Sequence, residues 1–146
     1  MCVAAASCAL FRAPPTPVQQ LRREVDGMPG LASEAAFVPV DADSAEAAWG
    51  RIVRARTETP LAESRQLALA FDATAAEPAQ IVVGGRYPKL TEQVLLDAFA
   101  LARTARLPGL QLVLVSPEPP FAALLAACED RGAVCTHWRW SETQPE

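Results

Sequence analysis

The residues whose types and spacing could do chemistry gather in the turn Gly84-Gly85-Arg86-Tyr87-Pro88-Lys89. Its two glycines would let a ligand approach the backbone closely, and Arg86 and Lys89 supply the cations that a phosphate needs. The turn lies between an apolar run and a helix-forming segment, where ligands of open α/β sheets usually bind. It therefore predicts a phosphate-binding site, and an ordinary glycine turn with solvated cations is the alternative.

Other chemical motifs in the chain are incomplete. A P-loop needs Gly-Lys-Ser/Thr after four residues, and a dinucleotide fingerprint needs a third glycine, so the turn matches neither. His137 is the single histidine, and strand alternation places it on the same face as Cys135. Such neighbours stand about 7 Å apart at Cα, which is poor for a direct hydrogen bond. We therefore assign no catalytic residue, and the sequence favours a protein that is not an enzyme.

Three segments resemble the nucleotide-binding half of group 1 (GT-B) glycosyltransferases, over about residues 80 to 132. They are Val83-Gly84-Gly85-Arg86, Leu95-Leu96-Asp97-Ala98-Phe99-Ala100 and the run from Leu107 to Val115. In that family the arginine and lysine after the first strand contact the donor diphosphate, which implies this role for Arg86 and Lys89. The family also uses a second acidic segment and a separate acceptor domain, for which this chain has no room. An active transferase by itself is therefore not expected.

Composition limits the classes of partner. The 146 residues are 51% hydrophobic and 21% charged, which fits a globular chain, and the net charge is −4. This balance gives no general attraction to phosphate backbones or anionic lipid, so we expect neither a nucleic-acid nor a membrane partner. The opening segment has no basic residue before its apolar stretch and is too short for a signal peptide, so a cytoplasmic protein is expected.

The four cysteines, Cys2, Cys8, Cys128 and Cys135, show no two-residue spacing of the kind found in zinc or redox motifs. We therefore expect no metal and no cofactor. Cys128 falls on a predicted helix and Cys135 on the next predicted strand. Both are expected to be small, buried, reduced side chains.

The elements around the turn predict an α/β domain with a mixed sheet of about five strands and helices packed on it. The strand candidates are the apolar runs 36–40, 67–71, 81–83 and 110–115 and the alternating residues 134–140. Since helices join the last three strands, these are expected to be parallel, in a C-terminal β-α-β-α-β Rossmann-like portion. The link from 72 to 80 is too short for a helical crossover, so 67–71 and 81–83 are expected to pair antiparallel.

The helices and chain ends complete the predicted organisation. A helix after Ser44 is expected to dock through Trp49, and the helix after the glycine turn is expected to be capped by Thr91. Prolines and glycines break any helix before residue 36 that is longer than Val18–Val25. The chain is thus divided into a flexible arm at 1–36, a single α/β domain at 37–140 and a disordered tail at 141–146.

Trp138 and Trp140 alternate along the last predicted strand and could form an aromatic contact surface, since tryptophan is enriched at binding hot spots. Packing in the core is the alternative for these two rings. The function expected from the sequence is a small non-catalytic α/β module that acts through protein or ligand contacts, with a protein partner. The alternative is a domain that binds a nucleotide or nucleotide-sugar diphosphate, a phosphate-containing small molecule, and is completed by another subunit.

Overall fold

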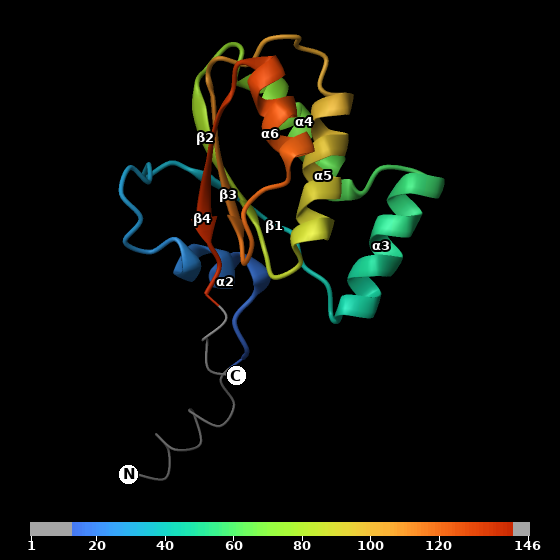
Figure 1. Cartoon of the computed structure of the whole chain (residues 1–146). Coiled ribbons are helices and arrows are strands. Elements are labelled where there is room, and N and C mark those ends of the chain that lie inside the picture. Colours follow the sequence, from blue (N-terminus) through green and yellow to red (C-terminus); the bar gives the residue numbers. More distant parts are fainter. Residues whose placement is uncertain (1–12, 142–146) are drawn as a thin grey trace, which may run out of the picture.

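The computed structural model describes residues 13–141, which form one sheet with helices on it (Figure 1). The strands are β1 (Ala36–Pro39), β2 (Ala79–Gly84), β3 (Leu110–Ser116) and β4 (Val134–Arg139). The helices are α2 (Pro17–Glu24), α3 (Ala45–Thr57), α4 (Ala62–Ala73), α5 (Pro88–Leu101) and α6 (Ala122–Arg131). The α/β class is confirmed. Within residues 13–141, no helix has the length and apolar character needed to cross a membrane.

All four strands are parallel and lie in the order β1-β2-β3-β4. Because every connection crosses the sheet in the same direction, right-handed crossovers place their helices on one face. Figure 1 shows α4, α5 and α6 packed there, with α3 standing further out. The core on this face joins Ile81, Val83, Leu112 and Leu114 of the sheet to buried residues of all four helices. The apolar run predicted as a strand at 110–115 is β3, an inner strand of the sheet in which only Gln111 is exposed.

The second face of the sheet is covered by α2 and the chain that follows it. The Thr16 side chain caps α2, and Gln19 bonds back to the Thr16 backbone. Leu21 and Val25 are fully buried in a second cluster with residues of β2 and β3 and with Trp140. Residues 17–35 therefore belong to the folded unit and not to an arm. Residues 1–12 of the predicted arm and residues 142–146 of the predicted tail lie outside the described residues.

The strand expected at 67–71 is wrong, because this run lies inside α4. Ser64, Leu67, Ala68 and Phe71 are buried while Leu69 is 73% exposed, which is a helical spacing and not a strand alternation. A five-residue apolar run fits either element, and only its packing on α5 decides between them. Without this strand, the antiparallel pair and the mixed five-stranded sheet are also wrong. The described strand order has no reversal of the kind that defines a doubly wound sheet.

The reduced state expected for Cys128 and Cys135 is wrong, because the two residues form a disulfide that ties α6 to β4. Gly132 ends α6 in the left-handed conformation, with φ of 70°, and turns the chain directly into β4. This turn brings the two Cα atoms to 6.3 Å, within the range that a disulfide spans. The separation of seven residues between Cys128 and Cys135 matches no known cysteine motif. The disulfide therefore becomes evident only from the turn at Gly132.

Reduction of this disulfide is expected to lower the free energy of unfolding by about 2 kcal/mol, because the bond closes a short loop in the unfolded chain. Urea denaturation with and without dithiothreitol measures the difference, and mass spectrometry of alkylated peptides identifies the cysteines released. The double variant Cys128→Ser/Cys135→Ser should show no dependence on dithiothreitol. An equal dependence in wild type and double variant would contradict this assignment.

Candidate functional site

The parallel strands bring the turn Gly84–Lys89 to the carboxyl edge of the sheet, beside the chain that follows β1 and β3. A Cβ added to Gly84 would lie 1.8 Å from the carbonyl oxygen of Val115, and one added to Gly85 would lie 2.0 Å from that of Val40. The Gly85 N–H donates to Val115 O at 3.1 Å, and the Val40 N–H donates to Gly84 O at 2.9 Å. The two glycines are therefore needed for the close approach of the protein's own backbone.

The two cations of the turn have different surroundings. Arg86 donates from Nη2 to Asp41 Oδ1 and to the Ala42 carbonyl, each at 3.2 Å, and its guanidinium lies over the Tyr87 ring. It thus reaches back to the chain after β1. Lys89 is exposed and has no ion pair within the described part of the chain. The structure brings together the four residues of the predicted phosphate site, and their role stays a prediction.

The amino end of α5 has no side-chain cap, because Tyr87 is its N-cap residue and makes no such hydrogen bond. Thr91, the expected cap, lies a turn inside the helix, 2% exposed, and its Oγ1 has no hydrogen-bond partner. It lines a hollow of about 10 Å³ with Glu92 and Ser116, which is room for roughly one water. Desolvation raises the pKa of the Glu92 carboxyl, and the charges of Arg56 and Lys89 partly oppose this shift.

Ser116 and His137 meet across β3 and β4, which sequence reasoning missed. His137 Nε2 lies 3.4 Å from Ser116 Oγ and 3.1 Å from the Ser116 carbonyl oxygen. The Ser116 hydroxyl donates its proton to the Glu118 carbonyl, so it does not offer that proton to the imidazole. The Cys135 thiol that could have paired with His137 is held in the disulfide. Neither arrangement provides a nucleophile and its base, and residues 13–141 contain no cluster suited to a metal ion.

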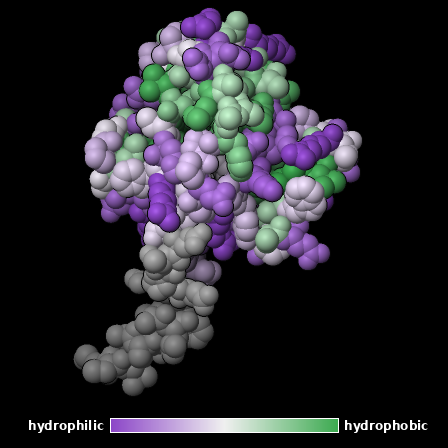
Figure 2. Space-filling model, viewed as in Figure 1, coloured by the Kyte–Doolittle hydropathy of each residue, from purple (hydrophilic) through white to green (hydrophobic). Residues whose placement is uncertain are grey.

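A groove lies beside the turn, between α3 and the start of α5, with a volume of about 240 Å³. We call it the α3 groove. One wall is a helical stripe of α3, formed by Ala45, Ala48, Trp49 and Ile52. The other wall is formed by Tyr87, Pro88 and Leu90, and the charged residues that line the groove are Lys89 and Glu118. Figure 2 shows hydrophobic side chains at the surface of α3 and a larger group over α6.

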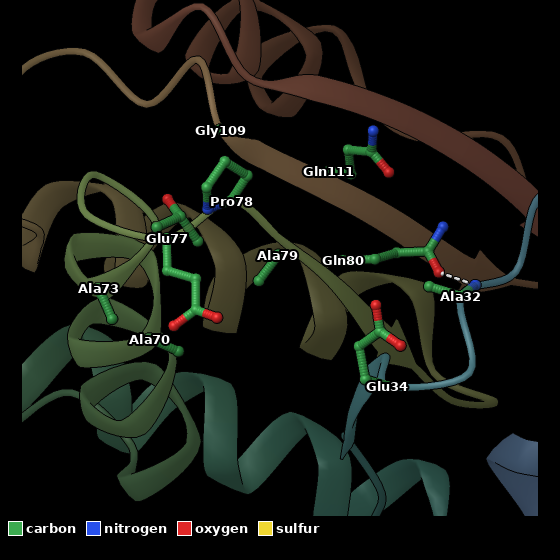
Figure 3. A pocket seen from close by; sticks show the side chains of 11 residues that line it. Ala32, Glu34, Ala70, Ala73, Glu77, Pro78, Ala79, Gln80, Gly109 and Gln111 are labelled. Carbon is green, nitrogen blue, oxygen red and sulfur yellow. Dashed lines mark hydrogen bonds between the residues drawn. The ribbon is translucent and has the colours of Figure 1, made fainter.

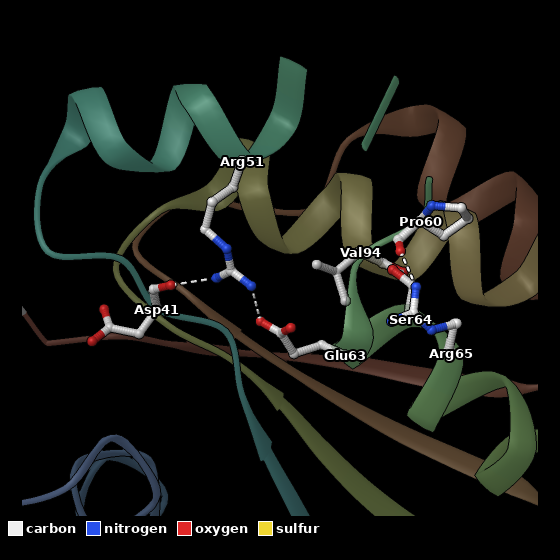
Figure 4. A network of polar contacts seen from close by, with 7 residues as sticks. All are labelled: Asp41, Arg51, Pro60, Glu63, Ser64, Arg65 and Val94. Atoms are coloured by element: carbon white, nitrogen blue, oxygen red, sulfur yellow. Dashed lines mark hydrogen bonds and ion pairs between the residues drawn. The ribbon is translucent and has the colours of Figure 1, made fainter. Parts of the chain in front are cut away.

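Trp49 does not dock α3, as the sequence predicted, because its ring is 53% exposed while Ala48 and Ile52 are buried. Ala48 and Ile52 pack into the core in its place, and polar contacts add to this packing (Figure 4). The Arg51 guanidinium donates to the Asp41 carbonyl and pairs with Glu63, which ties α3 to the chain after β1 and to α4. Helix α3 is thus fixed along its side, and Trp49 is left at the mouth of the groove.

The two tryptophans of the predicted contact surface are packed within the fold. Trp140 is 6% exposed in the cluster beneath α2, and the Trp138 indole N–H donates to the Glu24 carbonyl at 2.7 Å. Trp140 is therefore packed in the core, which was the alternative to a contact surface. The indole N–H of Trp138 is already hydrogen-bonded to the last residue of α2. Trp49 is the tryptophan with an exposed ring. Its helical spacing in the sequence resembles that of a core residue, so no sequence signal distinguished it.

A second pocket, of about 500 Å³, lies at the opposite, amino edge of the sheet (Figure 3). Alanines, Pro78 and Gly109 form much of its lining, and Glu34 and Glu77 supply its charges. The Gln80 side chain is held on both sides, since it accepts from the Ala32 N–H at 2.7 Å and donates to the Gly30 carbonyl at 3.1 Å. None of the residues predicted to bind a ligand lies in this pocket.

The geometry at the carboxyl edge thus offers a groove for binding and no reacting pair. Comparison of the chain with models of protein families, with curated proteins and with solved structures found no match.

Proposed function

We propose that this chain is a small non-catalytic α/β module that acts by binding a partner or ligand in the α3 groove. The observation that carries the proposal is the Trp49 ring, 53% exposed at the mouth of an apolar groove on the carboxyl edge of the sheet. An exposed tryptophan leaves a large apolar surface in water, and tryptophan is enriched among residues that dominate binding energy. Binding sites combine such apolar walls with a few polar groups, and Lys89 and Glu118 are the charged groups of this groove.

Apolar fragments added to the ¹⁵N-labelled protein are expected to shift the amide signals of Tyr87, Leu90 and Ile52, which surround the groove. Trp49→Ala should weaken this binding at least tenfold, because it removes the largest apolar contact. It should change the free energy of unfolding by no more than about 0.5 kcal/mol, since the ring is exposed. Fragment titrations followed by NMR, with urea denaturation of both proteins, measure the two effects.

The matched control is Leu69→Ala, which removes another exposed apolar side chain, 73% exposed on α4. This variant should bind the fragments as the wild type does. Equal loss of binding in both variants would show a general surface effect and would sink the proposal. Shifts confined to other parts of the chain would do the same.

A second candidate function is the binding of a nucleotide or nucleotide-sugar diphosphate at Gly84–Lys89, completed by another subunit. It is favoured by the uncapped start of α5 beside Lys89, since free N–H groups at a helix amino end attract anions. A thermal-shift screen with nucleotides, nucleotide-sugars and phosphates tests it. A stabilisation that is lost in Arg86→Ala would support this candidate over the α3 groove, and the absence of any stabilisation would reject it.

The cytoplasmic location expected from the sequence remains part of the proposal. Disulfides are rare in reducing cytosol, so the state of Cys128 and Cys135 in cells bears directly on it. Rapid alkylation of cells, followed by peptide mass spectrometry, measures the fraction of the pair that is oxidised. A fully oxidised pair would argue against a cytoplasmic location.

A further inference from the structure

Strand β4 leaves one edge of the sheet open within residues 13–141, since β3 is its one neighbour in the strand order. The Trp140 N–H donates to the Ser116 carbonyl of β3 at 2.9 Å. Backbone groups alternate in direction along a strand, so every second residue counted back from Trp140 also faces β3. The backbone groups that point away from the sheet are therefore those of Cys135, His137 and Arg139. A row of unpaired N–H and C=O groups is a template for another strand.

The two edges of the sheet differ in how they are protected against pairing. The other edge strand, β1, has four residues and ends in Pro39, and short edge strands with proline are common devices against pairing. Strand β4 has six residues without proline or lysine, and its one charged residue, Arg139, lies at its end. Its register with β3 is continuous, so no bulge twists this edge away. The β4 edge is therefore the one suited to pair with a further strand.

Helix α6 exposes apolar side chains beside this edge, where Figure 2 shows a group of hydrophobic residues. The disulfide between Cys128 and Cys135 places the stripe of α6 that contains Cys128 over β4. Leu125 and Ala122 continue this stripe at helical spacing, and both are exposed, Leu125 by 47%. An apolar helix face and an unpaired strand edge thus lie on the same side of the molecule.

An antiparallel second copy of β4 would match the strand edge. Antiparallel strands pair residues whose backbone groups face each other, and one register pairs all three outward-facing residues of β4. In this register His137 would lie opposite its own copy, and Cys135 would lie opposite Arg139. On the face that α2 covers, Thr136 would lie opposite Trp138, and aromatic residues pair favourably with β-branched ones across strands. The edge is thus complementary to itself.

The same two-fold arrangement would bring the two α6 helices into contact. Since α6 connects β3 to β4, it lies above these strands, and its copy would lie about two strand spacings away, or about 10 Å. Packed helices are separated by roughly 8–10 Å. His137 lies about 7 Å beyond Cys135 along β4, which equals roughly four residues of α6 counted back from Cys128. The two-fold axis would therefore pass close to Leu125, and the two Leu125 side chains would meet there.

We propose that this chain forms a two-fold symmetric dimer through antiparallel pairing of β4 with β4 of a second copy and through packing of the two α6 helices. The strand edge is about 20 Å long, and the sheet with its helix layer is about 20 Å deep, which gives on the order of 800 Å² buried in the pair. Stable interfaces usually bury more, so the dimer is weak and reversible. The inference is independent of the α3 groove.

Sedimentation equilibrium of the full chain over a wide range of concentration tests the inference, and we expect a monomer–dimer equilibrium. Hydrogen exchange followed by NMR locates the interface. The amides of Cys135, His137 and Arg139 should exchange more slowly as the protein concentration rises. The amide of Thr136, which faces β3, should show no such dependence.

Charge variants at Leu125 test the two-fold axis. Leu125→Glu and Leu125→Lys should each weaken self-association about tenfold or more, because two like charges would meet at the centre of the interface. An equimolar mixture of these two variants should associate again, because opposite charges would then meet. Both variants should fold, since Leu125 is exposed. The matched control is Leu69→Glu on α4, which should dimerise as the wild type does.

Three results would overturn the inference. A monomer at every concentration would do so, and it would leave the β4 edge for a strand of a different protein. A dimer that forms without slower exchange at Cys135, His137 and Arg139 would place the interface elsewhere. A mixture of the two Leu125 variants that associates no better than either variant alone would rule out the two-fold contact at this residue.

Discussion

Gly85→Ala is expected to destabilise the protein by about 3 kcal/mol or more, as overpacking against a rigid neighbour does in the most severe cases. The added Cβ would lie 2.0 Å from the Val40 carbonyl oxygen, which is backbone and cannot turn away as a side chain can. Relief requires the chain after β1 or the turn itself to move, which would strain the hydrogen bonds Gly85 N–H to Val115 O and Val40 N–H to Gly84 O. Urea denaturation followed by circular dichroism measures the loss.

Gly50→Ala is the matched control, because a Cβ at Gly50 meets nothing within 4 Å. Gly50 lies inside α3, where alanine is the better helix former, so this variant should be more stable by roughly 0.5–1 kcal/mol. The same substitution is therefore expected to act with opposite sign at the two sites. A Gly85→Ala protein as stable as the wild type would show that the turn does not need its glycine. The space beside residue 85 would then be available to a ligand.

Phe71→Ala is expected to cost about 3–5 kcal/mol, the range for truncation of a buried aromatic side chain. Phe71 is fully buried, and its ring lies 4.9 Å from that of Phe99, centroid to centroid, between α4 and α5. Truncation leaves a cavity in the core that covers the sheet and removes an aromatic pair. The free energy of unfolding in urea is the measurement.

The variant Leu69→Ala distinguishes the observed helix from the strand that the sequence predicted at 67–71. In a strand, residues 69 and 71 would point to the same face, so both truncations would cost several kcal/mol if Phe71 were buried. In α4, Leu69 is 73% exposed, and its truncation should change stability by no more than about 0.5 kcal/mol. A large loss in both variants would contradict the helical assignment of this segment.

Much of the fold could be predicted from local patterns. The apolar run 110–115 predicted a strand, and β3 is that strand; such a continuous run is typical of a strand buried on both faces. Gly132 is of the residue type that favours a helix end, and it adopts the left-handed conformation at the end of α6. The pattern at 67–71 failed because five apolar residues fit a helix as well as a strand. Its helical nature depends on the buried face that α4 turns toward α5, and a short window of sequence does not contain that information.

The candidate site could be predicted only in part. The glycine turn was placed correctly at the carboxyl edge, since a strand and a helix flank it in the sequence. What fills the space around its glycines was not predictable, because Val40 and Val115 reach it through strand pairing. The same is true of Ser116 and His137, which meet through the register of β3 and β4.

The three tryptophans show which features local sequence determines and which depend on tertiary packing. By itself, the sequence determined the α/β class, the C-terminal alternation of strands and helices, and the position of the glycine turn, because hydrophobic periodicity and turn residues act locally. The exposure of Trp49, the burial of Trp140 beneath α2 and the disulfide between Cys128 and Cys135 were decided by tertiary structure. Each depends on which distant segment covers a surface, and that is set by packing of the whole chain, not by the residues next to it.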